Sequence, residues 1–310
     1  MSGRTMRSGA DLDRPFPDWE KMNALLTSAV AGLTAGGTYA LLGVCAVFTY
    51  RLVAVVNFTG ASIGAAVTFV LIALFEAGFP IWPSVLAGIA AGTLTGVAIG
   101  YIMTRWFGEA SASTKAAVTV ALLVGLIAVG LRLTGGQHPH NMPELFPGSA
   151  FRLAGVEVTI ASVLTIGLAV LFTILSDLFL NRTKVGLNLR ALADRPMAAE
   201  LLGVRVQLLS LLVWGMTGAF TTFALMIIAP QRSPNFMTLS LLVVPALAAA
   251  LIGLFRSFWW TLAGGIALGI VEGLASSIES VSQYRGAIPF LVVLAVLLWS
   301  QREARWDEAR

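Results

Sequence analysis

Residues 25–78 form one nearly continuous apolar stretch, and this run limits the folds that are open to the chain. A helix that crosses a bilayer needs about 20 mostly apolar residues, because about 30 Å of hydrocarbon is covered at about 1.5 Å per residue. The stretch is therefore too long for one span, and we divide it into two around residues 51–57. Only 12% of the 310 residues are charged, whereas soluble domains carry about 25%. A water-soluble globule of this size needs a polar surface that this composition does not supply.

Other apolar runs follow along the chain, separated by short polar segments. Backbone amides in lipid must be hydrogen-bonded within the membrane, so such runs are either helices or the strands of a closed barrel. The runs are unbroken and lack the alternation of barrel strands. The sequence therefore predicts an all-α polytopic membrane protein, with eight or nine transmembrane helices in residues 25–300 between polar tails at 1–24 and 301–310. After the first two spans, the predicted spans are 82–104, 117–134, 158–180, 208–229, 241–255, 258–279 and 287–300, the last of which is open to a short or re-entrant helix.

Glycines repeat at intervals of four within several of these spans. Residues spaced by four lie on one helix face, and small residues there let helix backbones approach closely, within a chain or across a subunit interface. We favour packing within the chain. The stripes are Gly88, Gly92, Gly96 and Gly100, then Gly265, Gly269 and Gly273, and the shorter pair Gly32 and Gly36.

The segment 181–207 is the most basic connection in the chain, with five Lys and Arg residues. Such loops stay on the cytoplasmic side. Five spans precede the segment, which places the N-terminus outside, against its own four basic residues, and the C-terminal tail inside. Asp194 as a cap, Pro196 in the first turn and Gly203 past the end indicate a short helix at about 195–202. This helix either lies on the bilayer interface or is covered by another protein surface.

Several short motifs resemble one known family in their order and spacing. The run GLNLRALADRPMAAELLGV resembles the cytoplasmic coupling segment of branched-chain amino acid ABC permeases. Upstream, LTAGGTYALLGVCAVFTYRLVAVVNFTGASIGA resembles the first two spans of that family, which join at an Asn-Phe break. MPELF, GGIALGIVEGLASS and YRGAIPFLVVLAVLL follow in the family's order. The resemblance covers about residues 25–300, and the Asn-Phe form favours the first of the family's two paired permeases.

The resemblance implies a role and a set of partners. The chain would be the permease subunit of an ABC importer in a bacterial plasma (inner) membrane, with a second homologous permease subunit, two cytoplasmic ATPase subunits and an extracytoplasmic solute-binding protein. Carried onto this chain, the ATPase-coupling contact comprises Arg190, Ala191, Asp194, Ala198, Ala199, Leu202 and Gly203. The sequence contains no G-x-x-x-x-G-K-[ST] phosphate loop. We therefore expect ATP on the partner subunits and no cofactor in this chain.

Polar side chains inside spans are costly in lipid and are functional candidates. Asn57 and Thr59 lie at the break between the first two spans, with Thr38 and Tyr39 before it. Unwound backbone at membrane depth is tolerated where it is buried or lines a cavity, so these residues are candidates for the translocation path. A helix-capping or interhelical hydrogen bond is the alternative for Asn57. Glu272 lies within the eighth predicted span, where we expect its carboxylate to pair with a basic or hydroxyl group of another span; a substrate contact is the second possibility.

Two patterns resemble a catalytic or a metal site, and neither is complete. Residues 60–64 read G-A-S-I-G, the form of a serine nucleophile elbow. Such a serine needs a nearby histidine, and His138 and His140 both lie in a loop. With Glu144 as the nearest carboxylate, these two imidazoles also supply too few metal ligands. We expect neither an enzyme nor a metal site, and we interpret Cys45, the single cysteine, as a packing residue.

One turn departs from the family pattern, between the seventh and eighth predicted spans. Members usually carry a glycine-rich turn there, and only Gly253 and Ser257 match it. The residues that replace expected glycine or proline are Leu254, Arg256, Trp259 and Trp260. The chain is therefore predicted to be a divergent member, and its solute is open between branched-chain amino acids and urea or short amides. A secondary transporter without ATPases would need several intramembrane carboxylates or inverted repeats, and Glu272 is the one strong candidate.

Overall fold

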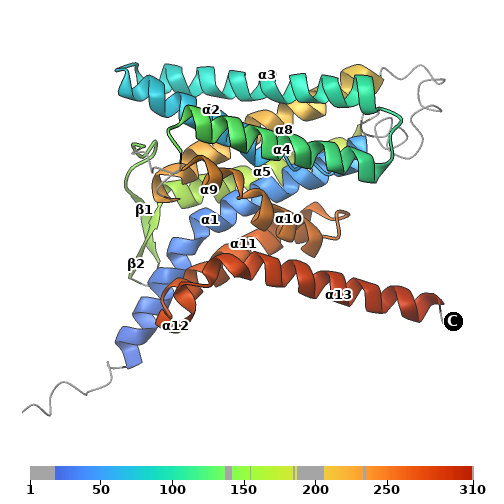
Figure 1. Ribbon diagram of the computed structural model, residues 1–310. Coiled ribbons are helices and arrows are strands. Elements are labelled where there is room, and N and C mark those ends of the chain that lie inside the picture. Colours follow the sequence, from blue (N-terminus) through green and yellow to red (C-terminus); the bar gives the residue numbers. More distant parts are fainter. Residues whose placement is uncertain are drawn as a thin grey trace, which may run out of the picture.

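The computed structural model describes residues 18–136, 142–153, 155–183, 186, 206–232 and 235–308. In this part the chain forms a bundle of apolar helices with a two-stranded antiparallel hairpin at one end (Figure 1). The longer helices are α1 (Asp18–Val53), α2 (Gly60–Glu76), α3 (Ile81–Phe107), α4 (Ala112–Leu133), α5 (Ile160–Arg182), α8 (Val206–Ile228), α10 (Val243–Ile252), α11 (Phe258–Ser276) and α13 (Ile288–Glu308). The short elements are β1 (Ser149–Leu153), β2 (Val156–Thr159), η2 (Ala229–Arg232), α9 (Phe236–Ser240), α12 (Glu279–Ser282) and η3 (Arg285–Ala287).

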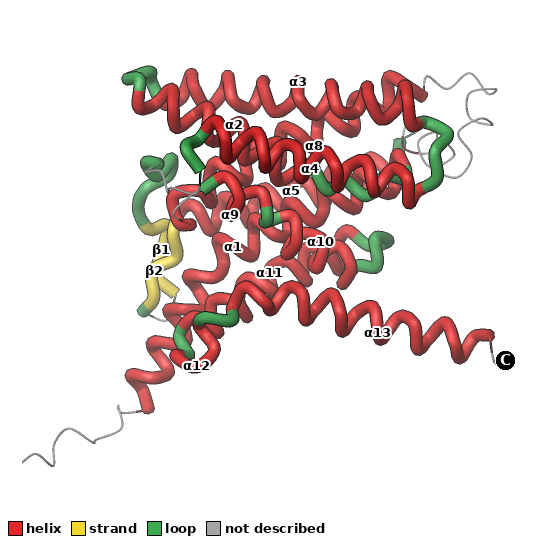
Figure 2. The backbone as a smooth tube through the Cα atoms, in the orientation of Figure 1, coloured by secondary structure: helices red, strands yellow, loops and turns green. Residues whose placement is uncertain are grey.

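The helices confirm a polytopic, all-α membrane protein. Six of them, in the described part, are long and apolar enough to cross a membrane, and three shorter apolar segments accompany them: 60–76, 236–252 and 285–300. Each predicted span corresponds to one of these nine. Loops gather at the two ends of the bundle, so the long helices run between the same two levels (Figure 2).

The two ends of the bundle can be named from the direction of the helices. The start of α1 lies at the end that carries the β-hairpin, and α5 stops at the opposite end, where α13 also finishes (Figure 1). The sequence predicts five spans before the segment 181–207, and in the part of the chain that the structure describes five long helices, α1 to α5, precede it. The start of α1 and the end of α5 therefore lie at opposite ends of the bundle. Following the charge-based prediction, we call the end at Arg182 the cytoplasmic end and the end with the hairpin the outer end.

Three elements differ from the predicted spans. Helix α1 begins at Asp18, earlier than residue 25, so it includes the end of the segment that the sequence analysis assigned to the polar N-terminal tail. The predicted span 241–255 is shorter in the structure, where α10 covers Val243–Ile252. A separate short helix, α9, precedes the predicted span, because Asn235 and Thr238 form a capping box that starts it at Phe236. The last predicted span is one continuous helix, α13, that runs from the hairpin end to the opposite end of the bundle (Figure 1), and its apolar segment, 285–300, is one of the shorter ones.

Both long glycine stripes pack against helices of the same chain. Gly88, Gly92, Gly96 and Gly100 of α3 lie against α8, where a Cβ on any of them would overlap Met226, Thr222 or Trp214. Gly265, Gly269 and Gly273 of α11 lie against α1, where they meet Gly32, Gly36 and Ala40. The α1–α11 and α3–α8 contacts are the most extensive between helices in the described chain. The prediction of packing within the chain is confirmed, and the bundle contains two tightly packed helix pairs.

Candidate functional site

The predicted path residues are all buried, and the structure separates them into two groups. Tyr39 of α1 and Glu272 of α11 meet near the outer end, whereas Asn57 and Thr59 lie together at the break between α1 and α2. Thr38 joins neither group through its hydroxyl, which donates to the backbone oxygen of Thr34 one turn earlier (2.9 Å). That local bond is the usual arrangement for a threonine inside an apolar helix.

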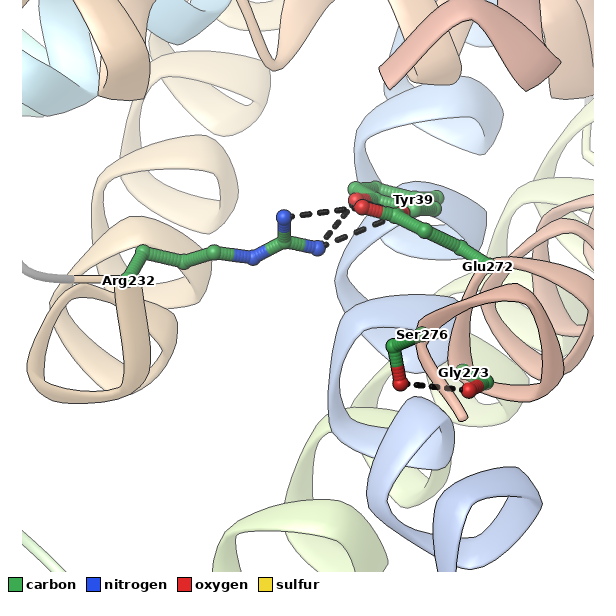
Figure 3. Close-up of polar contacts among 5 residues, drawn as sticks. All are labelled: Tyr39, Arg232, Glu272, Gly273 and Ser276. Atoms are coloured by element: carbon green, nitrogen blue, oxygen red, sulfur yellow. Dashed lines mark hydrogen bonds and ion pairs between the residues drawn. The ribbon is translucent and has the colours of Figure 1, made fainter. Parts of the chain in front are cut away.

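Glu272 pairs with a third residue, Arg232, that the sequence analysis did not single out. The guanidinium Nη1 donates to Glu272 Oε1 at 2.9 Å and Nη2 donates to Oε2 at 3.3 Å, so the pair is bidentate (Figure 3). The Tyr39 hydroxyl donates to Glu272 Oε2 at 2.5 Å and accepts from Arg232 Nη2. The expectation that Glu272 pairs with a basic or hydroxyl group of another span is confirmed on both counts.

The position of Arg232 explains why this cluster has a stable electrostatic arrangement. Arg232 ends η2, directly after α8, and its side chain reaches across to α1 and α11 (Figure 3). Its guanidinium also lies 5.7 Å from the centroid of the Tyr39 ring. The side chains of Arg232 and Glu272 are 26% and 11% exposed, so both charged groups are largely shielded from solvent. Bidentate charge-assisted bonds offset the desolvation of both groups, and losing one partner would leave the other charge uncompensated.

Asn57 organises the break between α1 and α2. Its Oδ1 accepts from the Thr59 amide (2.9 Å) and from the Thr59 hydroxyl (2.7 Å), forming a side-chain turn just before α2 starts. The unwound backbone has a partner as well, because Thr119 of α4 donates to the carbonyl of Val56 at 2.9 Å. Asn57 therefore makes neither the helix-capping nor the interhelical hydrogen bond of the alternative: its bonds are a local turn before α2, whose N-cap is Thr59. These bonds satisfy polar groups that lipid would leave unpaired.

A small cavity lies beside this break, enclosed by α1, the start of α2, α8 and α10. The space open to the centre of a water molecule is about 20 Å³, which is room for about one water. Its walls combine apolar groups with the Asn57 amide, the Cys45 thiol and two threonines of α8. The lining residues are Leu42, Cys45, Ala46, Asn57, Gly60, Ala61, Thr217, Thr221, Val243, Ala246 and Leu247. Asn57 thus lines a cavity and makes local bonds, and in this conformation the cavity is too narrow for an amino acid.

The G-A-S-I-G sequence at 60–64 has a packing role. Ser62 is fully buried, and its hydroxyl donates to the Thr59 carbonyl at 2.8 Å. A Cβ on Gly64 would press on the Thr221 backbone and the Leu225 side chain of α8. The pattern therefore serves the α2–α8 contact, as the small-residue interpretation predicts. His138 and His140 lie outside the residues that the structure describes.

The turn between α10 and α11 shows what the departures from the family pattern do to the backbone. Leu254 and Phe255 have φ angles of 49° and 53°, a left-handed conformation that favours glycine. Gly253 is required by space, since a Cβ there would overlap the Thr261 hydroxyl, and Ser257 caps α11 by accepting from the Trp260 amide (3.3 Å). The two residues that match the family thus keep structural roles, while two that do not match carry strain.

Replacing Leu254 by glycine is expected to stabilise the protein. A left-handed residue with a Cβ costs about 1–2 kcal/mol, and the added freedom of glycine in the unfolded chain offsets about 0.5–1 kcal/mol of the relief. Leu254 is 40% exposed, so its side chain contributes little burial. We expect a net gain of about 0.5 kcal/mol, measured as a higher thermal midpoint in detergent. Leu254→Ala is the control, because it removes the same side chain and keeps the Cβ; an equal shift for both variants would contradict strain as the cause.

Comparison with known proteins identifies the family. Residues 28–297 match the family described as "Branched-chain amino acid transport system / permease component". The chain belongs to this family. Among its relatives, the high-affinity branched-chain amino acid transport system permease protein BraD of Pseudomonas aeruginosa is 24% identical over 88% of this chain and 93% of its own length. The corresponding permease protein LivH of Escherichia coli is 26% identical over 86% of this chain and 91% of its own length.

A solved structure also aligns with most of the chain. PsaBC from Streptococcus pneumoniae, in complex with a Fab, covers 92% of this chain and 95% of its own chain at 18% identity, with a TM-score of 0.48. Family membership makes this chain a transport permease component and not an enzyme. Low identity to BraD and LivH agrees with a divergent member. The predicted coupling residues at 190–203 fall in a gap of the described chain, between residues 186 and 206.

Proposed function

We propose that this chain is the membrane-spanning subunit through which an ABC importer moves a branched-chain amino acid or a similar small solute across a bacterial inner membrane. The observation that carries the proposal is the family match over nearly the whole chain, which names a permease component of a branched-chain amino acid transport system. The relatives align over more than nine tenths of their own lengths. The similarity therefore extends over most of the length of these permeases, and the matched residues 28–297 include both the outer cluster and the helices that flank the proposed coupling segment.

The proposed partners follow from what this chain lacks and from where its connections lie. The sequence has no phosphate loop, so ATP hydrolysis would belong to two separate ATPase subunits. They would contact residues 190–203, which lie between α5 and α8 in the sequence; α5 stops at the cytoplasmic end (Figure 1). A second homologous permease subunit would complete the path, and an extracytoplasmic binding protein would deliver the solute to the outer end.

The arrangement of Glu272 bears on the secondary-transporter alternative. A coupling carboxylate in such a transporter must exchange protons or bind an ion during each cycle. Glu272 has both oxygens engaged by a guanidinium and one also by a tyrosine hydroxyl. That pairing supports a structural or gating role over ion coupling, and it favours transport driven by ATPases.

The proposal is tested by reconstitution. The chain is co-expressed with the second permease and the ATPases encoded beside it, purified, and placed in proteoliposomes with the cognate binding protein. We expect the ATPases to co-purify and labelled leucine to accumulate only with ATP inside the cytoplasmic compartment. Competition by urea or acetamide in place of leucine would assign the solute to the short-amide class. Uptake without ATPases would contradict the proposal.

A tryptophan at Ala199 is expected to block assembly with the ATPases. Small side chains at 198 and 199 would let the short helix enter a groove on the ATPase, and a large ring would not fit. We expect at least a tenfold loss of co-purified ATPase and of ATP-driven uptake, since about 1.4 kcal/mol lost at the contact has this effect. Ala112→Trp is the control, because Ala112 is an exposed alanine at the same end of the bundle, at the start of α4. Normal ATPase binding by the Ala199 variant would remove residue 199 from the contact.

A further inference from the structure

The outer cluster connects the two glycine-packed helix pairs. Tyr39 and Glu272 both belong to the α1–α11 pair, which is held together by backbone contacts at Gly36 and Gly269. Arg232 belongs to the segment that ends α8, the partner of α3. The hydrogen bonds of Arg232 therefore join one pair to the other, whereas the Tyr39–Glu272 bond lies within a pair.

The cluster also lies on the outer side of the small cavity. Along α1, Tyr39 precedes the cavity residue Leu42 by about one turn in the direction of the outer end. Along α8, the cavity residues Thr217 and Thr221 come before Arg232, which lies past the outer end of that helix. Helix α1 thus contributes to both the cavity wall and the polar bridge, and the segment that follows α8 carries Arg232 to the outer side of the cavity.

These contacts differ in how readily they can part. The glycine contacts are close backbone packing over several turns, and separating them would expose long helix faces. The Arg232 bridge consists of hydrogen bonds and an ion pair made by the end of one long side chain, with a quarter of that side chain already exposed. Water or a charged group that enters from the outer end can replace the bridge without unpacking either pair.

We propose that Arg232, Glu272 and Tyr39 form an outer latch, which holds the α3–α8 and α1–α11 pairs together in the closed conformation seen here and parts when the cavity opens to the outside. The latch serves the proposed transport function, because a permease must open to the side from which solute arrives. On opening, the Arg232 side chain moves away, while Tyr39 and Glu272 stay together as its binding partners on the α1–α11 pair. The bridge excludes water from the cavity while it is closed.

Cys45 provides a reporter for this motion. It is the single cysteine of the chain, it is buried, and it lines the cavity. The measurement is the rate at which a membrane-impermeant, positively charged methanethiosulfonate modifies Cys45 in the assembled transporter, applied to the outer face of right-side-out vesicles and followed by intact mass. Cys45→Ala gives the background. Neither solute nor ATP is needed, so failure of the transport assay and failure of the latch are separate results.

Arg232→Gln and Glu272→Gln are each expected to raise the outer-face modification rate about tenfold or more, since losing one partner of such a pair strongly weakens it. The matched control is Arg152→Gln, which breaks the Arg152–Glu157 pair of the hairpin at the same end (2.7 Å, both side chains more than half exposed) and should leave the rate unchanged. Tyr39→Phe should give a smaller increase. The exchange Arg232→Glu with Glu272→Arg restores opposite charges and should bring the rate back toward that of the unmodified protein.

Several results would overturn the latch. One is an unchanged rate in both single variants. Another is an equal increase in Arg152→Gln, and a third is an equal increase when the reagent is applied to the cytoplasmic face, which would indicate general loosening. If a single variant fails to assemble, the neutral pair Arg232→Gln with Glu272→Gln leaves no uncompensated charge. Cys45 in this double variant must still react faster than Cys45 in the native sequence. A reaction rate equal to that of the native sequence would also contradict the proposal.

Discussion

Gly269→Ala is expected to destabilise the protein by about 3 kcal/mol or to prevent folding, although it adds one methyl group. A Cβ at this position would overlap the backbone nitrogen and Cα of Gly36, and it would also press on the carbonyl oxygen of Gly32. All three obstacles are backbone atoms, so no side-chain rotation can relieve the overlap. The two helices would have to move apart along their contact. We therefore expect a loss of stability at the upper end of the range that overpacking usually costs, about 1–3 kcal/mol.

The matched control is Gly125→Ala on α4. This glycine is also helical and within a predicted span, but nothing lies within 4 Å of a Cβ built there. Alanine is the better helix former, so the control should be neutral or slightly stabilising. Thermal midpoints and monodispersity in detergent report the difference, which corresponds to about 6–12 °C at about 2–4 °C per kcal/mol. Equal midpoints for the two variants would show that the α1–α11 contact is looser than the structure indicates.

The sequence predicted the spans and their packing because both depend on local patterns. Span positions follow from unbroken apolar runs, and glycines four apart face one direction on any helix. The break at Asn57 was also visible, although its alternatives were left open: local bonds and a cavity wall are both present. The predicted boundaries failed where capping decides them, as at Asn235, whose capping box starts a helix before the apolar run.

Arg232 was missed because its role depends on residues far away in sequence. It follows the sixth span in a short polar loop, where an arginine is ordinarily an interface residue. Its partners, Tyr39 and Glu272, lie 193 and 40 residues away, and only the packing of α1 against α11 brings them together. A usable signal was nevertheless present. Glu272 lies one turn from the outer end of its helix, and a basic residue follows the end of a neighbouring span at that level.

Glu272→Leu is expected to destabilise the protein by about 3 kcal/mol, because it leaves the Arg232 guanidinium and the Tyr39 hydroxyl without their acceptor in a poorly hydrated site. If unpaired charge is the cause, removing the remaining polar groups should restore stability. The combination Arg232→Met, Glu272→Leu and Tyr39→Phe replaces all three with apolar groups of similar size and is expected within about 1 kcal/mol of the unmodified protein.

The exposed pair on the hairpin sets the scale for this comparison. Glu157→Leu breaks an Arg–Glu pair in which Arg152 Nε and Nη2 both donate to Glu157 Oε1. Arg152 is hydrated, so we expect a loss of stability below about 1 kcal/mol. Thermal midpoints in detergent for these variants compare the stability changes, and adding Arg232→Met alone and together with Glu272→Leu completes the cycle that gives the interaction energy between residues 232 and 272. A triple variant as unstable as Glu272→Leu would mean that the side chains matter through packing. A triple variant could instead be stable but fail in ATP-driven uptake, or allow faster modification of Cys45 from the outer face. That result would show that these charges serve gating and not stability.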